Sequence, residues 1–372
     1  MAEIYTYHDG LVRSCPLFHM HPLESVDPAR FETPAVLKRL AAASRQLAEL
    51  KGIAASIPNQ HILISSLGTQ EAKDSSEIEN IVTTHDELFR DAAAPAAPSS
   101  ASAKEVLRYR QALISGFTLV KQTGVLSNNH IVSIQAELEQ KDAGFRKLPG
   151  TTLKNPATGE VVYTPPQDAP TIARLMAELE GFINGSPSYP ADPLIRMALI
   201  HHQFESIHPF YDGNGRTGRI VNVLYLVKEG LLDIPVLYMS RYIVRNKPEY
   251  YRLLQAVRDE DAWEEWVLYM LTAVEDTARQ AINAVEAIRT ALFEVKHLVR
   301  QRFRFYSQDL INHLFSHPYT KVQFVMSELG VSRITATRYL DELANAGVLH
   351  KLKAGRSNFY INTRLYDIMT RG

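Results

Sequence analysis

The sequence is poor in cysteine, in long apolar runs and in net charge. Its 372 residues include one cysteine, Cys15, so no disulfide can form within the chain, and we expect a reducing, cytoplasmic location. No run of about 18 apolar residues is present, and the N-terminus lacks the basic and apolar segments of a signal peptide, so we expect no membrane span. The formal net charge of −1 gives the whole chain no general attraction to nucleic acid or to anionic membranes.

Helical spacing of apolar residues dominates the chain and predicts a mainly α fold. The helices are expected at 34–50, from about 74, 103–124, 128–140, 168–184, 192–207, 215–231, 246–258 and 262–300. A turn-rich centre, NPATGE, flanked by β-branched and aromatic residues, predicts a β-hairpin within 146–164. The Ala-, Pro- and Ser-rich stretch 91–104 indicates a first domain boundary.

The last seventy residues predict a winged helix. A short helix ends at Gly330, a second runs between Ser332 as N-cap and Gly347 as stop, and a hairpin follows around AGRSN. Ten basic and five acidic residues lie from Arg302 onward, so positive charge gathers here. This surface could contact DNA or another protein. The residues expected to face outward are Arg333, Thr335, Thr337 and Arg338 on the second helix, with Arg356 in the wing; Ala336, Tyr339, Leu340 and Leu343 are expected to face inward.

The stretch HPFYDGNGRTGR, residues 208–219, has too few apolar side chains for a packing segment. Pro209 ends the preceding helix, so His208 lies where a side chain can enter a cleft and accept a proton. The glycines come before the next helix, whose free N–H groups can bind phosphate, and Arg216 and Arg219 share one face of that helix. A carboxylate at Asp212, beside phosphates, suggests Mg²⁺. The alternative is a polar loop between two helices.

These residues resemble the signature of the Fic family, HxFx(D/E)GNGRxxR, at every defined position. The family transfers AMP from ATP to a hydroxyl of a target protein. The resemblance implies that His208 is the general base and that Asp212 holds Mg²⁺, with Phe210 as a core anchor. It implies ATP binding by a further set of residues. These are Gly213, Asn214, Gly215, Arg216, Thr217, Gly218 and Arg219, with Arg219 at the γ-phosphate.

The resemblance also gives the predicted hairpin a function as a flap that holds an extended target segment by strand addition. Its residues would be Thr151, Thr152, Leu153, Val161, Val162 and Tyr163. Fic proteins often place a tyrosine against the adenine. Of Tyr250 and Tyr251 we assign Tyr251, although a core aromatic is an equal alternative for either residue.

A second motif, SSEIEN at 75–80, has two interpretations. Ser76 and Glu79 have the spacing of a capping box, which would make this the start of a helix. Some Fic proteins instead carry an inhibitory motif, (S/T)xxxE(G/N), which Ser75, Glu79 and Asn80 fit. The resemblance then implies that Glu79 pairs with Arg219 and keeps the γ-phosphate out of place. In some Fic proteins the same glutamate supports removal of AMP.

The resemblance extends to Fic proteins of the SoFic type, which also end in a winged helix. It implies an N-terminal region, 1–104, with an inhibitory helix at about 74–90, a catalytic core, 105–275, a connecting helix, 276–300, and a winged helix, 301–372. We expect an autoinhibited protein adenylyltransferase with ATP and Mg²⁺, acting on an unknown target protein and on itself. The alternatives are AMP removal, transfer of another nucleotide, or a DNA-binding regulator whose core senses nucleotide. A homodimer is one candidate assembly.

Overall fold

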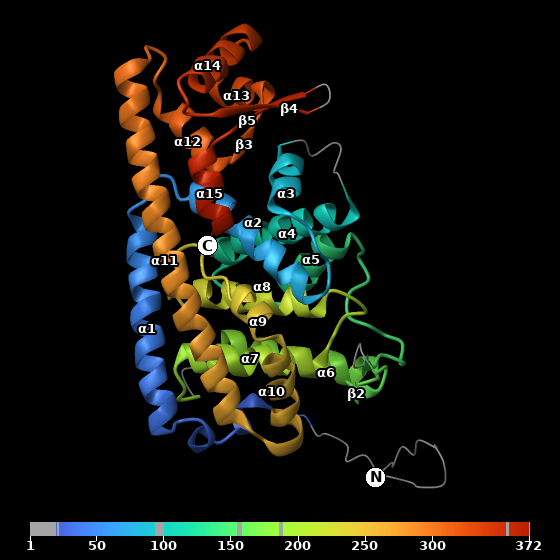
Figure 1. The fold of residues 1–372 in the computed structure, drawn as a ribbon. Coiled ribbons are helices and arrows are strands. Elements are labelled where there is room, and N and C mark those ends of the chain that lie inside the picture. The colour runs from blue at the N-terminus through green and yellow to red at the C-terminus, as the bar shows by residue number, and fades with distance from the viewer. Residues whose placement is uncertain are drawn as a thin grey trace, which may run out of the picture.

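A computed structural model of the chain describes residues 20, 22–93, 100–154, 158–185, 189–354 and 357–371. Helices make up most of it (Figure 1). Up to the end of the long helix, these are α1 (Pro34–Ala55), α2 (His61–Ile78), α3 (His85–Ala92), α4 (Ala101–Thr123), α5 (Asn128–Glu139), α6 (Ala169–Asn184), α7 (Pro193–Ile207), α8 (Asn214–Lys228), α9 (Ser240–Arg245), α10 (Lys247–Glu260) and α11 (Trp263–Arg302), with short 3-10 turns at Leu23–Ser25 and Pro28–Arg30.

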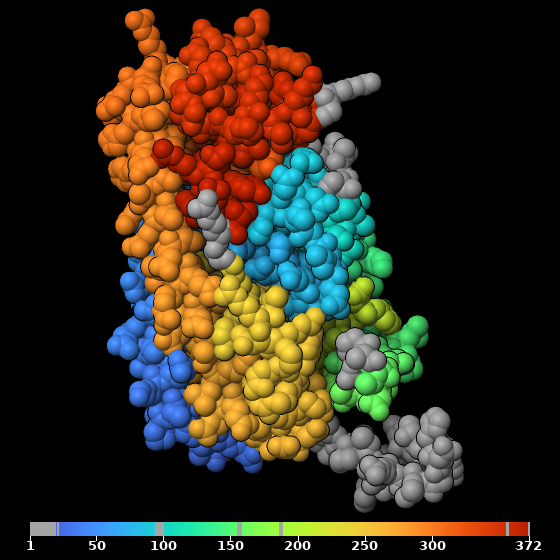
Figure 2. Space-filling model, viewed as in Figure 1, coloured from blue at the N-terminus to red at the C-terminus, as the bar shows by residue number. Residues whose placement is uncertain are grey.

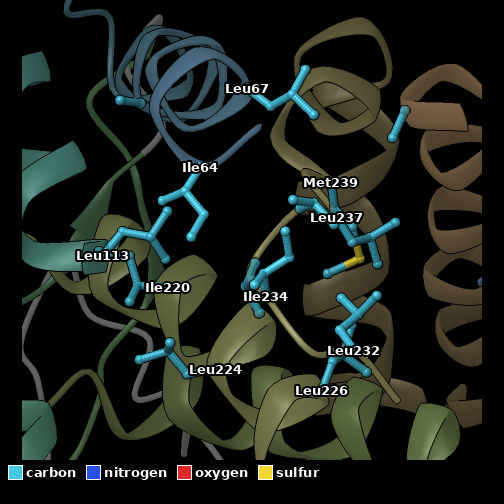
Figure 3. Packing of buried hydrophobic residues seen from close by; sticks show 14 of the residues in the cluster. Ile64, Leu67, Leu113, Ile220, Leu224, Leu226, Leu232, Ile234, Leu237 and Met239 are labelled. Carbon is cyan, nitrogen blue, oxygen red and sulfur yellow. The ribbon is translucent and has the colours of Figure 1, made fainter. Parts of the chain in front are cut away.

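Helices α7 and α8 form the centre of the core. Every residue of α7 from Leu194 to Ile207 is buried, as expected of a helix covered on all sides. The Asp192 side chain caps α7 by accepting a hydrogen bond from the Leu194 N–H, and Pro193 occupies the first helical position. On one side, α2 and α4 pack against this centre, and Ile64, Leu113 and Ile220 come together there (Figure 3).

Helix α11 forms one edge of the molecule and connects its two ends. Helix α11 is 40 residues long, and most of α1 lies alongside it (Figure 1). The predicted connecting helix, 276–300, is therefore the second half of one continuous helix that begins in the core at Trp263.

The helix expected at about 74–90 is wrong. The chain instead has α2, which ends at Ile78, a break, and α3, which begins at His85. The apolar residues Ile62, Leu63 and Leu67 start α2 much earlier, and Asn80 in the left-handed conformation, φ 62°, ends it. The alternative interpretation of Ser76 and Glu79 as a capping box is wrong, because Ser76 lies inside α2 and the pair that caps a helix here is Thr84 with Glu87 at the start of α3.

The C-terminal unit has the predicted order of helix, turn, helix and hairpin. It consists of α12 (Gln308–Ser316), β3 (Tyr319–Thr320), α13 (Val322–Leu329), α14 (Arg333–Asn345), β4 (His350–Ala354), β5 (Ser357–Ile361) and α15 (Thr363–Arg371). The three strands form an antiparallel sheet in the order β3-β5-β4. Ser332 caps α14, as predicted, by accepting a hydrogen bond from the Thr335 N–H.

This unit packs on the rest of the chain through α2, α3 and α11 (Figure 2). The Phe89 ring of α3 lies 6.2 Å from the Tyr319 ring and 5.9 Å from the Tyr366 ring, and Tyr319 donates a hydrogen bond to Asp86. These contacts join the C-terminal unit to α3, the helix that follows the SSEIEN motif, and α12 and α15 also pack on α2.

Candidate active site

The candidate site lies where α7 ends and α8 begins. His208 caps α7 in the left-handed conformation, φ 49°, and its N–H donates to the Phe204 carbonyl. The Asn214 side chain clamps the loop, since its Oδ1 accepts from the Phe210 N–H and its Nδ2 donates to the Phe210 carbonyl, both at 2.8 Å. Phe210 is fully buried against Phe145 and Phe204, which confirms it as a core anchor.

A buried arginine outside the motif also holds this loop. Arg146 donates from Nε to the His208 carbonyl at 2.7 Å and from a terminal nitrogen to the Ile207 carbonyl at 3.2 Å. Its own N–H donates to the Pro209 carbonyl at 2.8 Å. The sequence analysis missed this residue, because it lies 62 positions from His208 and follows no local pattern.

His208 is uncharged at neutral pH. Burial lowers its pKa to about 4, and the nearby positive charges of Arg146 and Arg258 lower it further than Glu79 raises it. An uncharged imidazole at the end of α7 can accept a proton from a hydroxyl placed beside it.

The start of α8 is an anion site that Glu79 fills. Gly213, the residue before the helix, has φ 75°, which favours glycine, and a Cβ there would lie 2.6 Å from Oε1 of Glu139. A Cβ at Gly215 would overlap Oε1 of Glu79. The Glu79 carboxylate therefore lies directly over the first turn of α8, where free N–H groups and the helix dipole favour negative charge.

Arg219 is held on the same side by α2. Its Nε donates to Ser75 Oγ at 2.8 Å, and a terminal nitrogen donates to the Ser75 carbonyl at 2.9 Å and to Glu79 Oε1 at 2.8 Å. The Arg219 side chain is 3% exposed and that of Glu79 is 34% exposed. Burial opposes ionisation of Glu79, but the charge and hydrogen bond of Arg219 outweigh it, so the pKa of Glu79 lies below its usual value.

Arg216 is paired with two carboxylates on the neighbouring helices. Its terminal nitrogens lie 3.3 Å from Glu105 of α4 and 2.7 Å from Glu139 of α5. Asp212, in the loop before α8, is exposed, and one of its carboxylate oxygens accepts from the Gly213 N–H. Together Asp212 and Glu139 offer hard oxygen ligands beside the start of α8, which fits Mg²⁺.

The remaining ATP-binding candidates of the motif face the interior. Thr217 is fully buried, and a Cβ at Gly218 would lie 2.8 Å from Oε1 of Glu205 and 3.0 Å from the Phe204 ring. The two polar groups of the Asn214 side chain both contact Phe210. These three residues therefore shape and fix the loop and the start of α8, and the Thr217 N–H is used inside the helix, where it donates to the Gly213 carbonyl.

Two buried acids behind Arg219 were also missed. Burial raises the pKa of Glu71 to about 8 and that of Glu205 to about 7. Glu71, on α2, contacts Tyr109 and Ser240, so it links α2 to α4 and α9. A glutamate inside a helix carries no sequence signal of burial, which is why neither was selected.

The two tyrosines of α10 have different environments. Tyr250 is 2% exposed and contacts His201 at 2.8 Å, as a core residue does, whereas Tyr251 is 47% exposed. Burial of its hydroxyl group and the nearby Glu79 charge raise the pKa of Tyr251 to about 12. Tyr251 is thus the tyrosine of the pair that a ligand near Glu79 could reach.

The hairpin lies against the end of α7. Strands β1 (Leu153–Lys154) and β2 (Val161–Tyr163) are antiparallel, while Thr151 and Thr152 precede β1, and 155–157 lie outside the described residues. Val161 and Val162 are 53% and 51% exposed. Tyr163 is buried, donates to the Ser206 carbonyl at 2.9 Å and lies under Arg258. Tyr163 thus anchors the hairpin to Ser206, which lies two residues before His208 in the chain.

The candidate DNA-contact residues lie on α14. Arg333 and Arg338 are exposed and Ile334 is 83% exposed. Thr335 and Thr337 are half-buried, and their hydroxyl groups contact Ser332 and the Arg333 carbonyl. Ala336, Leu340 and Leu343 are fully buried and Tyr339 is half-buried. Arg356 lies outside the described residues.

A helix long and apolar enough to cross a bilayer is absent from the part of the chain that the structure describes.

Three family models match the chain and together cover most of it. Residues 37–118 match "Fic/DOC family N-terminal", and residues 125–226 match "Fic/DOC family". Residues 293–365 match "Protein adenylyltransferase SoFic-like, C-terminal domain". The second range contains the whole α7–α8 junction.

Curated relatives resemble a shorter part. A protein adenylyltransferase Fic from Culex quinquefasciatus is 32% identical over 87 residues, which is 23% of this chain and 16% of the relative. One from Drosophila yakuba is 36% identical over 90 residues, 24% of this chain and 17% of the relative. The match thus spans about a sixth of the length of these relatives.

Solved structures share the fold. A Fic family protein from Desulfovibrio desulfuricans superposes with a TM-score of 0.57 at 19% identity, covering 90% of this chain and 98% of that one. A Fic domain containing signaling protein from Bacteroides thetaiotaomicron superposes with a TM-score of 0.52 at 17% identity, covering 66% and 98%. These likenesses establish a mainly α fold of this type.

Proposed function

The chain belongs to the Fic/DOC family, and we propose that it transfers AMP from ATP to a Ser, Thr or Tyr hydroxyl of a target protein. The observation that carries this proposal is the α7–α8 junction, where an uncharged histidine ends one helix and an anion site opens the next. A general base and a phosphate-binding site that lie next to each other suit transfer of a nucleotidyl group to a hydroxyl.

In this reaction the hydroxyl oxygen forms a bond to the α-phosphorus of ATP, and the bond from that phosphorus to pyrophosphate breaks. His208 takes the hydroxyl proton, because its imidazole is uncharged at neutral pH. Arg216 and the N–H groups at the start of α8 stabilise the negative charge on the phosphates. Asp212 is the residue that would hold Mg²⁺, which offsets phosphate charge when bound.

The exposed strand of the hairpin is the proposed holder of the target. Val161 and Val162 lie on β2, which pairs with β1 along one of its edges. Tyr163, at the end of β2, fixes this strand next to Ser206. A target segment added to this hairpin would lie near His208, bound mainly through its backbone.

We further propose that Glu79 holds the activity at a low level. Its carboxylate lies over the first turn of α8 and pairs with Arg219, which is the side chain proposed to hold the γ-phosphate. A phosphate cannot share this space with a carboxylate, because the two negative charges repel. The pair is part-exposed, so solvent screens it and we expect it to be worth less than the roughly 3–5 kcal/mol of a fully buried pair.

The test is transfer of label from α-labelled ATP with Mg²⁺. We compare the unchanged protein, Glu79→Gly, and Glu79→Gly combined with His208→Ala. Glu79→Gly is expected to raise labelling of the protein itself or of lysate proteins at least about tenfold, the effect of roughly 1.4 kcal/mol. The added His208→Ala change is expected to abolish it.

Glu77→Gln is the matched control, because Glu77 lies on the same helix turn but pairs with Lys73. It should leave labelling unchanged. Equal labelling of all variants would contradict inhibition by Glu79, and no labelling by any variant that still binds ATP would contradict the transferase. In that case hydrolysis of AMP from a modified protein, in which water takes up the AMP at the same site, is measured next.

A second candidate function is DNA binding through α14, favoured by the exposed Arg333 and Arg338. Phosphate contacts by these residues would make binding fall steeply with salt. Arg333→Ala with Arg338→Ala should weaken binding to duplex DNA and flatten its salt dependence, while Arg174→Ala, an exposed arginine of α6, should not. Docking of a protein on α14 would instead leave DNA binding absent in all variants.

A further inference from the structure

We propose that His313, His317 and Glu328 form a binding site for a divalent transition metal such as Zn²⁺ in the C-terminal unit. The site is separate from the α7–α8 junction and does not depend on the proposed function. His313 lies in α12, His317 is the residue that ends α12, and Glu328 lies in the last turn of α13. An ion here would join the two helices.

The three side chains already converge. His313 Nδ1 lies 2.7 Å from one oxygen of Glu328, and His317 Nε2 lies 3.1 Å from the other. One nitrogen from each histidine and one carboxylate oxygen all lie within 4.8 Å of one another. Two ligands of one tetrahedral zinc ion, each about 2.0–2.1 Å from it, are about 3.3 Å apart. Binding therefore needs the most widely separated pair of ligand atoms to move closer by at most about 1.5 Å, which the partly exposed side chains of His317 and Glu328 allow.

The second nitrogen of His313 has the partner that a metal ligand needs. Its Nε2 lies 2.5 Å from the Thr320 hydroxyl, a group that can accept a hydrogen bond from Nε2–H. That bond leaves Nδ1, the atom facing Glu328, with a lone pair for an ion. Histidine ligands commonly donate their other ring N–H to an oxygen in this way, which fixes the ring and the tautomer.

Packing also fixes the orientation of the two rings. The His313 side chain is fully buried, and its ring centroid lies 5.1 Å from that of His317. The Phe324 ring lies 5.5 Å from His317 on another side. The cost of ordering these ligands is thus largely met by the fold itself, which favours binding.

The ligand set selects the class of ion. Two imidazoles and one carboxylate suit Zn²⁺ and neighbouring transition metals, whereas Mg²⁺ and Ca²⁺ prefer oxygen ligands alone. His317 and Glu328 are 28% and 45% exposed, so an ion could enter from solvent and keep a water as a fourth ligand.

The experiment uses the full-length chain without a histidine tag. Co²⁺ is titrated and its visible absorption recorded, Zn²⁺ is used to displace it, and calorimetry gives the stoichiometry. We expect saturation at one ion per chain, a tetrahedral Co²⁺ spectrum, displacement by Zn²⁺ but not by Mg²⁺, and a higher unfolding temperature with Zn²⁺.

His317→Ala and Glu328→Gln should each weaken binding by about tenfold or more. His350→Ala, an exposed histidine of the same unit, is the matched control and should bind like the unchanged protein. Circular dichroism and metal-free thermal unfolding show whether each variant folds. The proposal is overturned if the unchanged protein binds no Zn²⁺ saturably, or if folded His317→Ala and Glu328→Gln both bind with unchanged affinity.

Discussion

Arg219 illustrates how single residues set the state of this site. Three hydrogen bonds from α2 hold its guanidinium, two to Ser75 and one to Glu79. Glu79 is the charged acceptor among the three, whereas both acceptors of Ser75 are neutral, so removing Glu79 should free Arg219 for a phosphate while Ser75 keeps it in position. That asymmetry is why Glu79→Gly is expected to raise activity without misplacing the arginine.

Glu71 and Glu205 should make the stability of the protein depend on pH. Their folded-state pKa values of about 8 and about 7 lie above the ordinary glutamate value, so the contribution of each carboxyl to the free energy of unfolding is complete below about pH 4.5. That contribution is lost as the pH rises through the folded-state pKa of the group. Glu71→Gln should therefore lose less stability than the unchanged protein between pH 5 and pH 8, by on the order of a few kcal/mol.

Urea unfolding at pH 5, 6.5 and 8 measures this difference. Glu205→Gln is the comparison. The difference in stability between Glu205→Gln and the unchanged protein should change little above about pH 7, whereas the difference for Glu71→Gln should continue to change up to pH 8. Curves for Glu71→Gln that run parallel to those of the unchanged protein would contradict a raised pKa at Glu71.

Asn214 should matter for the loop more than for the ligand. Asn214→Ala removes both contacts with Phe210 and leaves a buried N–H and a buried carbonyl unpaired, at a cost of about 2–4 kcal/mol. Urea unfolding checks this value, with Asn129→Ala, an exposed asparagine of α5, as control. A loss of stability no larger than that of the control would refute the clamp.

At the scale of elements, the end of α2 decides where Glu79 lies. Glu79 is the C-cap that follows Ile78, the last residue of α2, Asn80 then turns the chain, and Lys247 of α10 donates to the Ile78 carbonyl at 2.6 Å. The helix end is thus fixed from two sides, which places the Glu79 carboxylate against Gly215.

Asn80→Gly and Asn80→Val test this helix end. Glycine adopts the left-handed conformation without strain, so Asn80→Gly should leave labelling from ATP low. A β-branched residue resists it at a cost of roughly 1–2 kcal/mol, so Asn80→Val should lower stability and raise labelling by displacing Glu79. Low labelling by a destabilised Asn80→Val would show that the position of Glu79 does not depend on this turn.

The sequence predicts some of these elements better than others. The α7–α8 junction is local, with proline, glycines and charged residues inside twelve positions, so its elements and Phe210 could be predicted. The pairing of Glu79 with Arg219 spans 140 positions and came from a family motif alone. Arg146, Glu71 and Glu205 could not be found, because burial of a charged side chain depends on distant segments.

The start of α2 was missed for a different reason. Ser76 and Glu79 have capping-box spacing, which favoured a helix beginning there, yet Ser76 is buried inside the last turn of α2. A local pattern gave way to packing of Ile64 and Leu67 against the core, as tertiary contacts often override local preference.

At the scale of the whole molecule, the C-terminal unit and the N-terminal helices form one body. Helix α11 runs from the core to this unit, and α12 and α15 pack on α2 (Figure 1). The same α2 ends at Glu79, so a partner that moves the C-terminal unit would act on the helix that proposed inhibition depends on.

Phe89 is the residue that tests this coupling. It is 3% exposed and contacts Tyr319 and Tyr366, so Phe89→Ala should cost about 3–5 kcal/mol and loosen the C-terminal unit from α3. We expect the unchanged protein to unfold in a single transition in scanning calorimetry, and Phe89→Ala to unfold in two, the earlier one belonging to the C-terminal unit. Phe293→Ala, which removes a phenylalanine of α11 that is 52% exposed, should keep one transition. If Phe89→Ala also unfolds in a single transition, only at lower temperature, then the long helix α11 rather than the aromatic contact couples the two ends of the molecule.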